Sequence, residues 1–174
     1  MAELAELSPF EVVGARRDEI EALWRRIFPD TTEERFAEIL PRHVARRGFR
    51  FVAAEEKGRL AGFAYGYEGG AGEWWHDRVA AALGPAARRE WLGPRHLEFV
   101  ELQVSPEFEG RGIGGSLHDA LLAEARGATA VLSTQRSNER ALAFYRRRGW
   151  ETIVAEMDFG EGFEPFVVLG KRLG

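Results

Sequence analysis

The segment from Val104 to Leu122, VSPEFEGRGIGGSLHDALL, constrains the fold of this chain more than any other. It closes an apolar strand, turns through several glycines and begins a helix with an apolar stripe at Ile113, Leu117 and Leu121. Glycine allows positive φ angles and lets the backbone approach a ligand closely. The first amides of a helix carry a partial positive charge, so this segment is typical of a site for phosphate oxygens.

A buried strand is predicted after this helix, at Thr129 to Thr134, and strand–helix–strand implies a parallel pair with a right-handed crossover. Two aromatic-rich runs flank residues 56–59 and predict an antiparallel hairpin. The order of elements therefore predicts a mixed α/β (α+β) sheet with helices on both faces. The remaining strands are expected at Phe10–Ala15, His96–Val104, Trp150–Phe159 and Phe166–Leu173.

Helices are expected between these strands. Asp18 is a candidate N-cap for the first, and Thr31 or Thr32 begins the second. Residues 69–94 read as a helical insert, and Asn138 begins the last helix, which Gly149 ends. With 174 residues, no repeat and no linker, the chain is expected to form a single domain over residues 1–174.

Composition excludes several classes of function. A formal net charge of -4 argues against broad nucleic-acid binding, although it suits a cationic substrate. There is no cysteine, and no two of the four histidines stand three or four residues apart, so no metal site is expected. The N-terminus does not read as a signal peptide and no run reaches the roughly 20 apolar residues of a membrane span, so a cytoplasmic protein without membrane contact is expected.

Two nucleotide-binding interpretations of the glycine turn fit poorly. A P-loop needs GxxxxGK[ST], and no Lys-Ser or Lys-Thr pair is present. Gly110, Gly112 and Gly115 match GxGxxG, but a dinucleotide site has the turn after its first strand and an acid further on. Here the turn lies late in the chain, and Gln135 and Arg136 follow the next strand.

The segment resembles motif A of the GNAT acetyltransferases, whose turn [Q/R]-x-x-G-x-[G/A] holds the coenzyme A pyrophosphate. Gly112 and Gly114 match this turn, whereas Glu109 departs from the usual Gln or Arg. Residues 137–150, SNERALAFYRRRGW, resemble the family segment N-x-x-A-x-x-x-Y-x-x-x-G-[FW], which stands one strand later. The clear resemblance covers about residues 98–150. It implies the acyl-CoA N-acyltransferase fold, a seven-stranded, mostly antiparallel mixed sheet.

The resemblance also implies acetyl-CoA as co-substrate, with no metal, and direct transfer of its acetyl group to an amine. In the family a splayed strand offers free backbone groups to the pantetheine arm, a role that falls here on Leu102 and Val104. Asn138 is expected to contact coenzyme A as well as to cap its helix. The expected cofactor-binding residues are Leu102, Val104, Glu109, Gly110, Arg111, Gly112, Gly114, Gly115 and Asn138.

The catalytic residues are also implied by the resemblance. The family tyrosine that protonates the leaving thiolate corresponds to Tyr145. Glu98 stands where histone-type members have a glutamate base, on the same strand face as Val100 by alternation, and Glu101 on the opposite face is the second candidate. Other members have their glutamate on the next strand, where this chain has Ser133. A water chain without a dedicated base is the third possibility.

The acceptor amine is left open. Trp74 and Trp75 in the insert are candidate substrate-binding residues, because aromatic faces bind cations, but they can equally pin the insert to the core. The alternative to an N-acetyltransferase is a non-catalytic acyl-CoA-binding module that acts as a sensor or partner. A homodimer is possible, as in other family members.

Overall fold

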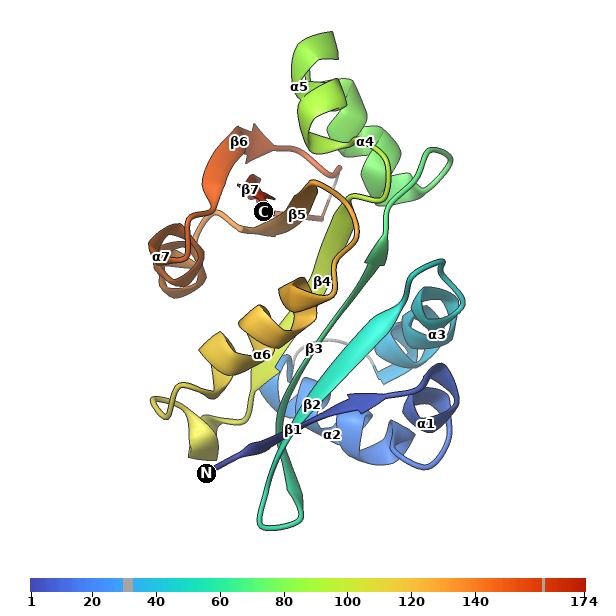
Figure 1. Ribbon diagram of the computed structural model, residues 1–174, viewed down its shortest axis with the longest axis vertical. Helices are drawn as coiled ribbons and strands as arrows, with labels where there is room; N and C mark the ends of the chain where they lie inside the picture. Colours follow the sequence, from blue (N-terminus) through green and yellow to red (C-terminus); the bar gives the residue numbers. More distant parts are fainter. Residues whose placement is uncertain (30–32, 161) are drawn as a thin grey trace. The chain divides into compact units, whose positions relative to one another are not determined.

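The computed structural model describes residues 1–29, 33–160 and 162–174. Its strands form one seven-stranded sheet in the order β1-β2-β3-β4-β5-β7-β6 (Figure 1). β4 and β5 are parallel, whereas β1–β2, β2–β3, β5–β7 and β6–β7 are antiparallel pairs. The prediction of a mixed, mostly antiparallel sheet is therefore confirmed.

The described elements run along the chain as follows. They are β1 (Glu3–Leu7), α1 (Pro9–Val13), α2 (Arg17–Ile27), α3 (Glu33–Val44), β2 (Arg50–Glu56), β3 (Arg59–Glu68), α4 (Trp74–Ala82), α5 (Pro85–Trp91), β4 (Leu97–Val104), the 3₁₀ turn η1 (Pro106–Phe108), α6 (Ile113–Ala123), β5 (Thr129–Gln135), α7 (Glu139–Arg147), β6 (Glu151–Met157) and β7 (Phe166–Arg172).

The chain divides into two compact units, and β4 contributes to both. The first unit comprises residues 1–67 and 100–124, and the second comprises residues 68–99 and 125–174. The single domain over residues 1–174 stays a prediction.

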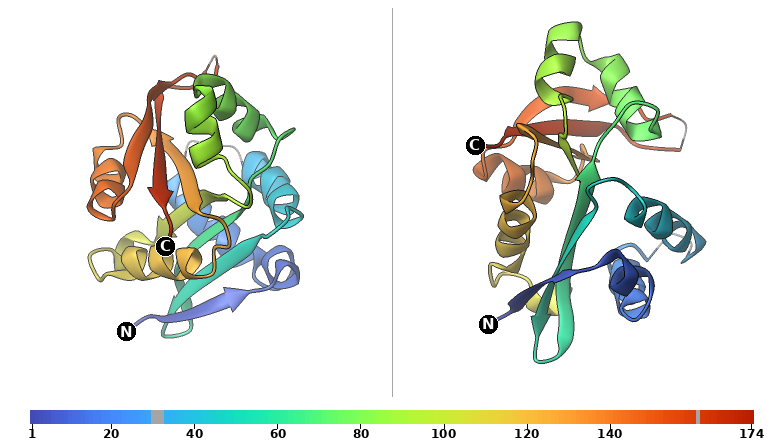
Figure 2. Two further views of the ribbon diagram at one scale, coloured as in Figure 1. Left: turned by 45° about the horizontal axis from the view of Figure 1, so that its top comes forward. Right: turned by 45° about the vertical axis from the view of Figure 1, so that its right-hand side comes forward.

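In the first unit, helices cover both faces of the strands. Figure 2 shows α1, α2 and α3 on one face of β1–β3 and α6 on the other. Arg50 on β2 reaches α6, where its guanidinium donates to the Leu121 carbonyl at 2.9 Å. The hairpin β2–β3 turns at Lys57 and Gly58, both with positive φ, as the sequence predicts for its two-residue turn.

In the second unit, β5, β7 and β6 form an antiparallel layer, with α7 on the opposite side from α4 and α5 (Figures 1 and 2). The predicted insert is thus a pair of short helices. α7 begins at the predicted cap, because the Asn138 side chain accepts a hydrogen bond from the Ala141 amide at 3.0 Å. It ends before Gly149, which has the predicted positive φ of 82°.

The prediction of a first strand at Phe10–Ala15 is wrong. Residues 9–13 form α1, and β1 precedes it at Glu3–Leu7. A capping box begins α1: Ser8 Oγ accepts from the Glu11 amide, and Glu11 Oε2 accepts from the Ser8 amide at 2.8 Å. The box stabilises a helix that the apolar run alone did not indicate.

The start of α2 also differs from the prediction. Arg16 occupies the N-cap position, and Asp18 lies inside the first turn. Arg16 forms ion pairs with Glu19 and with Glu55 on β2, which fix the chain at this position. The predicted start of the next helix at Thr31 or Thr32 lies outside the described residues.

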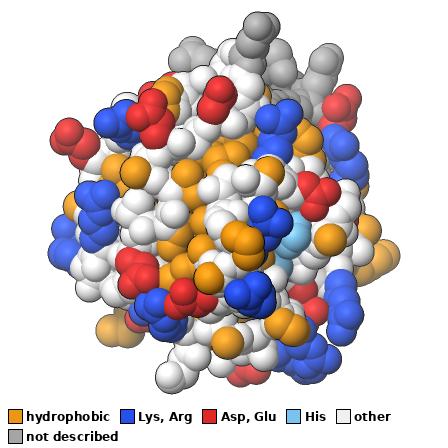
Figure 3. Space-filling view, turned by 90° about the horizontal axis from the view of Figure 1, so that it is seen from above, with side chains coloured by type: hydrophobic (Ala, Val, Ile, Leu, Met, Phe, Trp, Pro, Cys, Tyr) orange, Lys and Arg blue, Asp and Glu red, His pale blue; other side chains and the backbone are white. Residues whose placement is uncertain are grey.

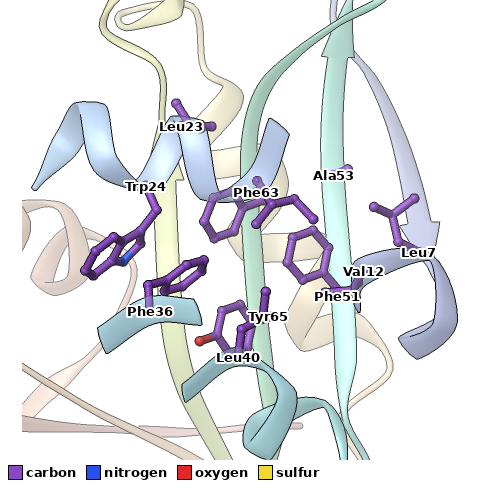
Figure 4. Packing of buried hydrophobic residues seen from close by; sticks show 11 residues of the cluster. Leu7, Val12, Leu23, Trp24, Phe36, Leu40, Phe51, Ala53, Phe63 and Tyr65 are labelled. Carbon is purple, nitrogen blue, oxygen red and sulfur yellow. The ribbon is translucent and has the colours of Figure 1, made fainter. Parts of the chain in front are cut away.

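The core of the first unit is aromatic. Phe51, Phe63 and Tyr65 stack along β2 and β3, and Trp24 of α2 stacks on Phe36 of α3 at 4.6 Å between ring centroids (Figure 4). Stacked aromatic pairs add to the stabilisation that their burial provides. This cluster fixes α2 and α3 against the strands.

His43 on α3 lies at the edge of this aromatic core. Its Nδ1 is 2.9 Å from the Tyr65 hydroxyl. Burial, Arg46 and Arg42 lower the pKa of His43 to about 4, and burial raises the pKa of Tyr65 well above 10. Near neutral pH Tyr65 is therefore protonated, and its hydroxyl donates a hydrogen bond to Nδ1 of a neutral His43 ring.

We expect the stability of the protein to fall between pH 6.5 and pH 4 in part because of His43. The unfolded chain binds the proton near pH 6.5, whereas the folded chain resists it down to about pH 4. The stabilisation is complete above pH 6.5 and its loss reaches about 2–3 kcal/mol at pH 4. Urea denaturation at pH 7 and pH 4.5 measures it. His43→Gln should show a smaller loss over this range, and an equal loss in both proteins would contradict the assignment.

Candidate functional site

The glycine turn between η1 and α6 adopts the positive φ angles that its glycines allow. Gly110 has a φ of 74° and Gly112, the N-cap of α6, a φ of 79°. A Cβ atom on either residue would meet no other atom within 4 Å. The glycines are therefore required by the backbone angles and not by crowding from the protein, and the space above them is open to a ligand.

The first amides of α6 belong to Ile113, Gly114 and Gly115. In an α-helix these groups have no carbonyl partner within the helix, and the first bond here runs from the Ser116 amide to the Gly112 carbonyl at 3.1 Å. Bare amides with a partial positive charge suit an anion such as a diphosphate.

Charged side chains border the turn. Arg111 donates to Glu56 Oε1 at 2.9 Å and lies over the Phe108 ring, at 5.3 Å from its centroid. Arg26 and Arg59 both pair with Glu107, which lowers the pKa of that carboxyl. The side chain of Glu109, which departs from the family pattern, is exposed. Its carboxylate can therefore stay hydrated.

β4 carries the two candidate bases and the two residues expected at the pantetheine arm. It pairs with β5 through Leu97–Ala130 and Glu98–Val131, both inside the second unit. Leu102 and Val104 belong to the first unit and are half-buried. Gly62 on β3 lies close against this part of β4, since a Cβ there would be 2.6 Å from the Gln103 carbonyl oxygen.

Glu98 is buried in the second unit, with 3% of its surface exposed. Its Oε1 lies 3.8 Å from Nε2 of His96, which is also buried. Sequence reasoning did not connect these two residues. Their spacing of two along a strand, which puts them on one face, was the available indication.

Glu101 lies in the first unit, where it accepts a hydrogen bond from Gln103 Nε2 at 2.7 Å. Burial raises the pKa of Glu101, while Gln103 and Trp24 oppose the shift. Val100 packs against the cluster that contains Trp24. The burial of the residues at this end of β4 does not alternate, and Glu101 stays the second candidate base.

Tyr145 and Asn138 lie in the second unit, where Asn138 is the N-cap residue of α7 and Tyr145 lies within that helix. The Tyr145 ring is 9% exposed and makes edge contacts with Phe99 at 6.1 Å and Trp150 at 5.6 Å. The ring is therefore held rigidly between β4 and the start of β6. Asn138 uses its side-chain oxygen for the helix cap.

The tryptophans of the insert have different surroundings. Trp75 donates from its indole nitrogen to Ser133 Oγ on β5 at 2.9 Å, and buried Trp91 packs against Gly170 of β7. Trp74 is 55% exposed, with Arg78 over its ring and Phe159 beside it. Trp75 and Trp91 thus attach the insert to the strands, and Trp74 is the most exposed of these three tryptophans.

Other site classes can be described briefly. Among the described residues, no three His, Cys, Asp or Glu side chains gather into a group that could hold a metal ion. Within the same part of the chain, no helix has both the length and the apolar character to cross a membrane. Basic and acidic side chains are interspersed over the face shown in Figure 3.

Comparison with known proteins agrees with this geometry. The model of the acetyltransferase (GNAT) family matches residues 17–150. The GCN5-like protein acetyltransferase Rv2170 of Mycobacterium tuberculosis is 30% identical over 175 residues, which cover 84% of this chain and 85% of the relative.

Solved structures share the fold at lower identity. The aminoglycoside 6'-acetyltransferase type Ii is 18% identical with a TM-score of 0.73, covering 99% of this chain and 97% of its own. The PaiA N-acetyltransferase of Thermoplasma acidophilum, solved in complex with coenzyme A, is 15% identical with a TM-score of 0.61, covering 99% of both chains. The sheet matches theirs, and the family model spans most of the sequence: the chain belongs to the GNAT acetyltransferase family.

Proposed function

We propose that this protein is an N-acetyltransferase that moves an acetyl group from acetyl-CoA directly to a primary amine of a small molecule or peptide. The observation that carries the proposal is the glycine turn: two glycines with positive φ, open space above them, and helix amides at residues 113–115 that precede the first bond within α6. The family match, and the coenzyme A complex of a protein with the same fold, support it.

The residues of the chain have distinct roles in this proposal. The amides of Gly112 to Gly115 hold the diphosphate, with Gly110 and Arg111 beside them, while the backbone of Leu102 and Val104 orients the pantetheine arm. When bound, acetyl-CoA supplies the activated acetyl group as a thioester. Asn138 contacts the co-substrate, Tyr145 gives a proton to the departing sulfur, and Trp74 and Trp75 contact the acceptor.

A base must take a proton from the acceptor ammonium. We assign this role to Glu98, whose carboxylate is buried beside a histidine and matches the position of the glutamate in histone-type members. Glu101 is the alternative, because burial raises the pKa of its carboxyl and so favours uptake of a proton.

Conservative substitutions separate the two glutamates. We expect Glu98→Gln to lower kcat/KM by about 100-fold or more and to remove the rise of the rate with pH. Glu101→Gln, the matched control, should lower it by less than about fivefold and keep that rise. Steady-state rates from pH 5.5 to 9 measure both. The opposite pattern would make Glu101 the base, and a retained pH profile in both would favour a water chain.

The function itself is tested with a panel of amines. Thiol release from acetyl-CoA should be stimulated by at least one of lysine peptides, peptides with a free N-terminus, polyamines or aminoglycosides. Protein substrates come first because the relative of 30% identity is named a protein acetyltransferase. Thermal stabilisation by acetyl-CoA without thiol release on any amine would instead favour the acyl-CoA-binding module. Cytoplasmic location and a homodimer stay predictions.

A further inference from the structure

His96 and Glu98 form a buried pair at the start of β4, in the second unit. Only 2% of His96 and 3% of Glu98 is exposed. His96 Nδ1 is 2.8 Å from the Gly93 carbonyl oxygen, and Nε2 is 3.8 Å from Glu98 Oε1. Because a carbonyl only accepts, Nδ1 carries the proton of the neutral ring and Nε2 is left as a bare acceptor.

The second ring nitrogen of His96, Nε2, has no hydrogen-bond partner among the described residues. Over residues 1–29, 33–160 and 162–174, no group hydrogen-bonds to Nε2. A buried bare acceptor that faces a carboxylate is unfavourable, and one added proton on Nε2 would turn the pair into an imidazolium and a carboxylate. The geometry therefore provides a place for one proton.

Gly69, at the end of β3, keeps the two side chains together. Its amide donates to the His96 carbonyl at 3.0 Å, so its position is fixed. A Cβ atom on Gly69 would collide with both His96 Nε2 and the Glu98 carboxylate. Glycine at this position is thus required for the His96–Glu98 pair, and a substitution there disturbs the pair without changing either titratable group.

Two polar side chains of α4, His76 and Asp77, lie on one side of the His96–Glu98 pair. The His76 ring lies 5.4 Å from the His96 ring, and His76 Nδ1 is 3.1 Å from Asp77 Oδ1. The Asp77 side chain is about half exposed. His76 is the titratable group of α4 in ring contact with His96, and its partner Asp77 is in contact with solvent.

We propose that His96 is a positioning residue that stores the proton taken by Glu98, which rests on the proposed function of Glu98 as the base. The N–H bond of the acceptor ammonium breaks and its proton passes to the Glu98 carboxylate. It then passes to His96 Nε2, where an N–H bond forms and Glu98 returns to a carboxylate. The imidazolium afterwards releases the proton to water on the side of His76 and Asp77.

The first test measures protonation directly and needs neither acetyl-CoA nor an acceptor. Nitrogen-15 NMR of histidine-labelled protein should show His96 as the Nδ1–H tautomer at high pH. In Glu98→Gln, the Nε2 resonance of His96 should shift at neutral pH, since the carboxylate that faces this nitrogen is lost. His118, a buried histidine of the first unit, is the control, and its resonances should stay in place. The other tautomer, or an unshifted His96, would overturn the proposal.

The second test measures coupling in catalysis. We expect His96→Gln to lower kcat/KM by about tenfold to 100-fold and to alter its pH profile, with the KM for acetyl-CoA unchanged. Gly69→Ala should reproduce this effect. In the double variant His96→Gln/Glu98→Gln, the loss should not exceed that of Glu98→Gln alone. Losses that multiply would overturn the coupling.

The two tests also separate failure of this inference from failure of the proposed function. If the protein transfers no acetyl group but His96 responds to Glu98→Gln as expected, the interaction between the two residues is supported and the acetyltransferase proposal is contradicted. If the wild-type protein is active but His96 does not respond to Glu98→Gln, the acetyltransferase proposal is supported and the proton transfer to His96 is contradicted. Melting temperatures of all variants check that they are folded.

Discussion

Gly112→Asp should abolish coenzyme A binding, with the dissociation constant raised on the order of 100-fold or more. The new side chain would stand at the N-cap of α6, in the space that the glycine leaves open. A carboxylate there would repel the diphosphate and compete for the same amides, and like charges at a binding site cost several kcal/mol. Isothermal titration with coenzyme A measures the loss.

The matched control is Gly112→Asn. Asn and Asp have nearly the same shape and both tolerate the left-handed backbone that a φ of 79° requires. The Asn variant should therefore bind coenzyme A within about tenfold of the wild type. Equal losses in the two variants would mean that the backbone or the added volume matters and not the charge. Normal binding by Gly112→Asp would contradict the site.

Tyr145→Phe should lower kcat by about 100-fold while coenzyme A binds as before. The phenol hydroxyl is the proposed proton donor to the leaving sulfur, and general acid catalysis contributes about 100-fold to 10,000-fold. The phenyl ring keeps the edge contacts with Phe99 and Trp150, so the melting temperature should change by less than about 2 °C. Single-turnover rates and titration with coenzyme A separate the two effects.

Tyr67→Phe provides the comparison for Tyr145→Phe. It removes the same hydroxyl from a buried tyrosine of the first unit, which contacts Arg46 and His43. Turnover should stay within about twofold, since the position lies outside the predicted site. If both substitutions lower kcat equally, the deficit in Tyr145→Phe is not specific to a proton donor.

Features with a local cause were predictable from the sequence. The positive φ of Gly112, the cap at Asn138 and the hairpin turn each depend on residues close in the chain. The prediction of a strand at Phe10–Ala15 was wrong because it rested on the apolar run, whereas the capping box of Ser8 and Glu11 begins a helix there. The S-x-x-E pattern from Ser8 to Glu11 is typical of a helix start.

The parts that escaped prediction depend on contacts between distant segments. Trp24 of α2 acts on the pKa of Glu101, 77 positions later in the chain, and the place of Glu101 in its strand does not indicate this. Likewise the Trp75 indole hydrogen-bonds to Ser133, which lies 58 positions later in the chain. No local pattern specifies such a pair, whereas the pairing of His96 with Glu98 could have been inferred from their strand spacing.

The hydrogen bond between Trp75 and Ser133 couples the insert to β5. The family resemblance predicts that other members have a glutamate at the position of Ser133, and here the Ser133 hydroxyl accepts from the Trp75 indole. A glutamate at 133 is longer than serine and charged, so it would displace the Trp75 indole from its present position even though it can accept the same hydrogen bond. Exchange of residues 75 and 133 together should therefore disturb the insert less than exchange of residue 133 alone.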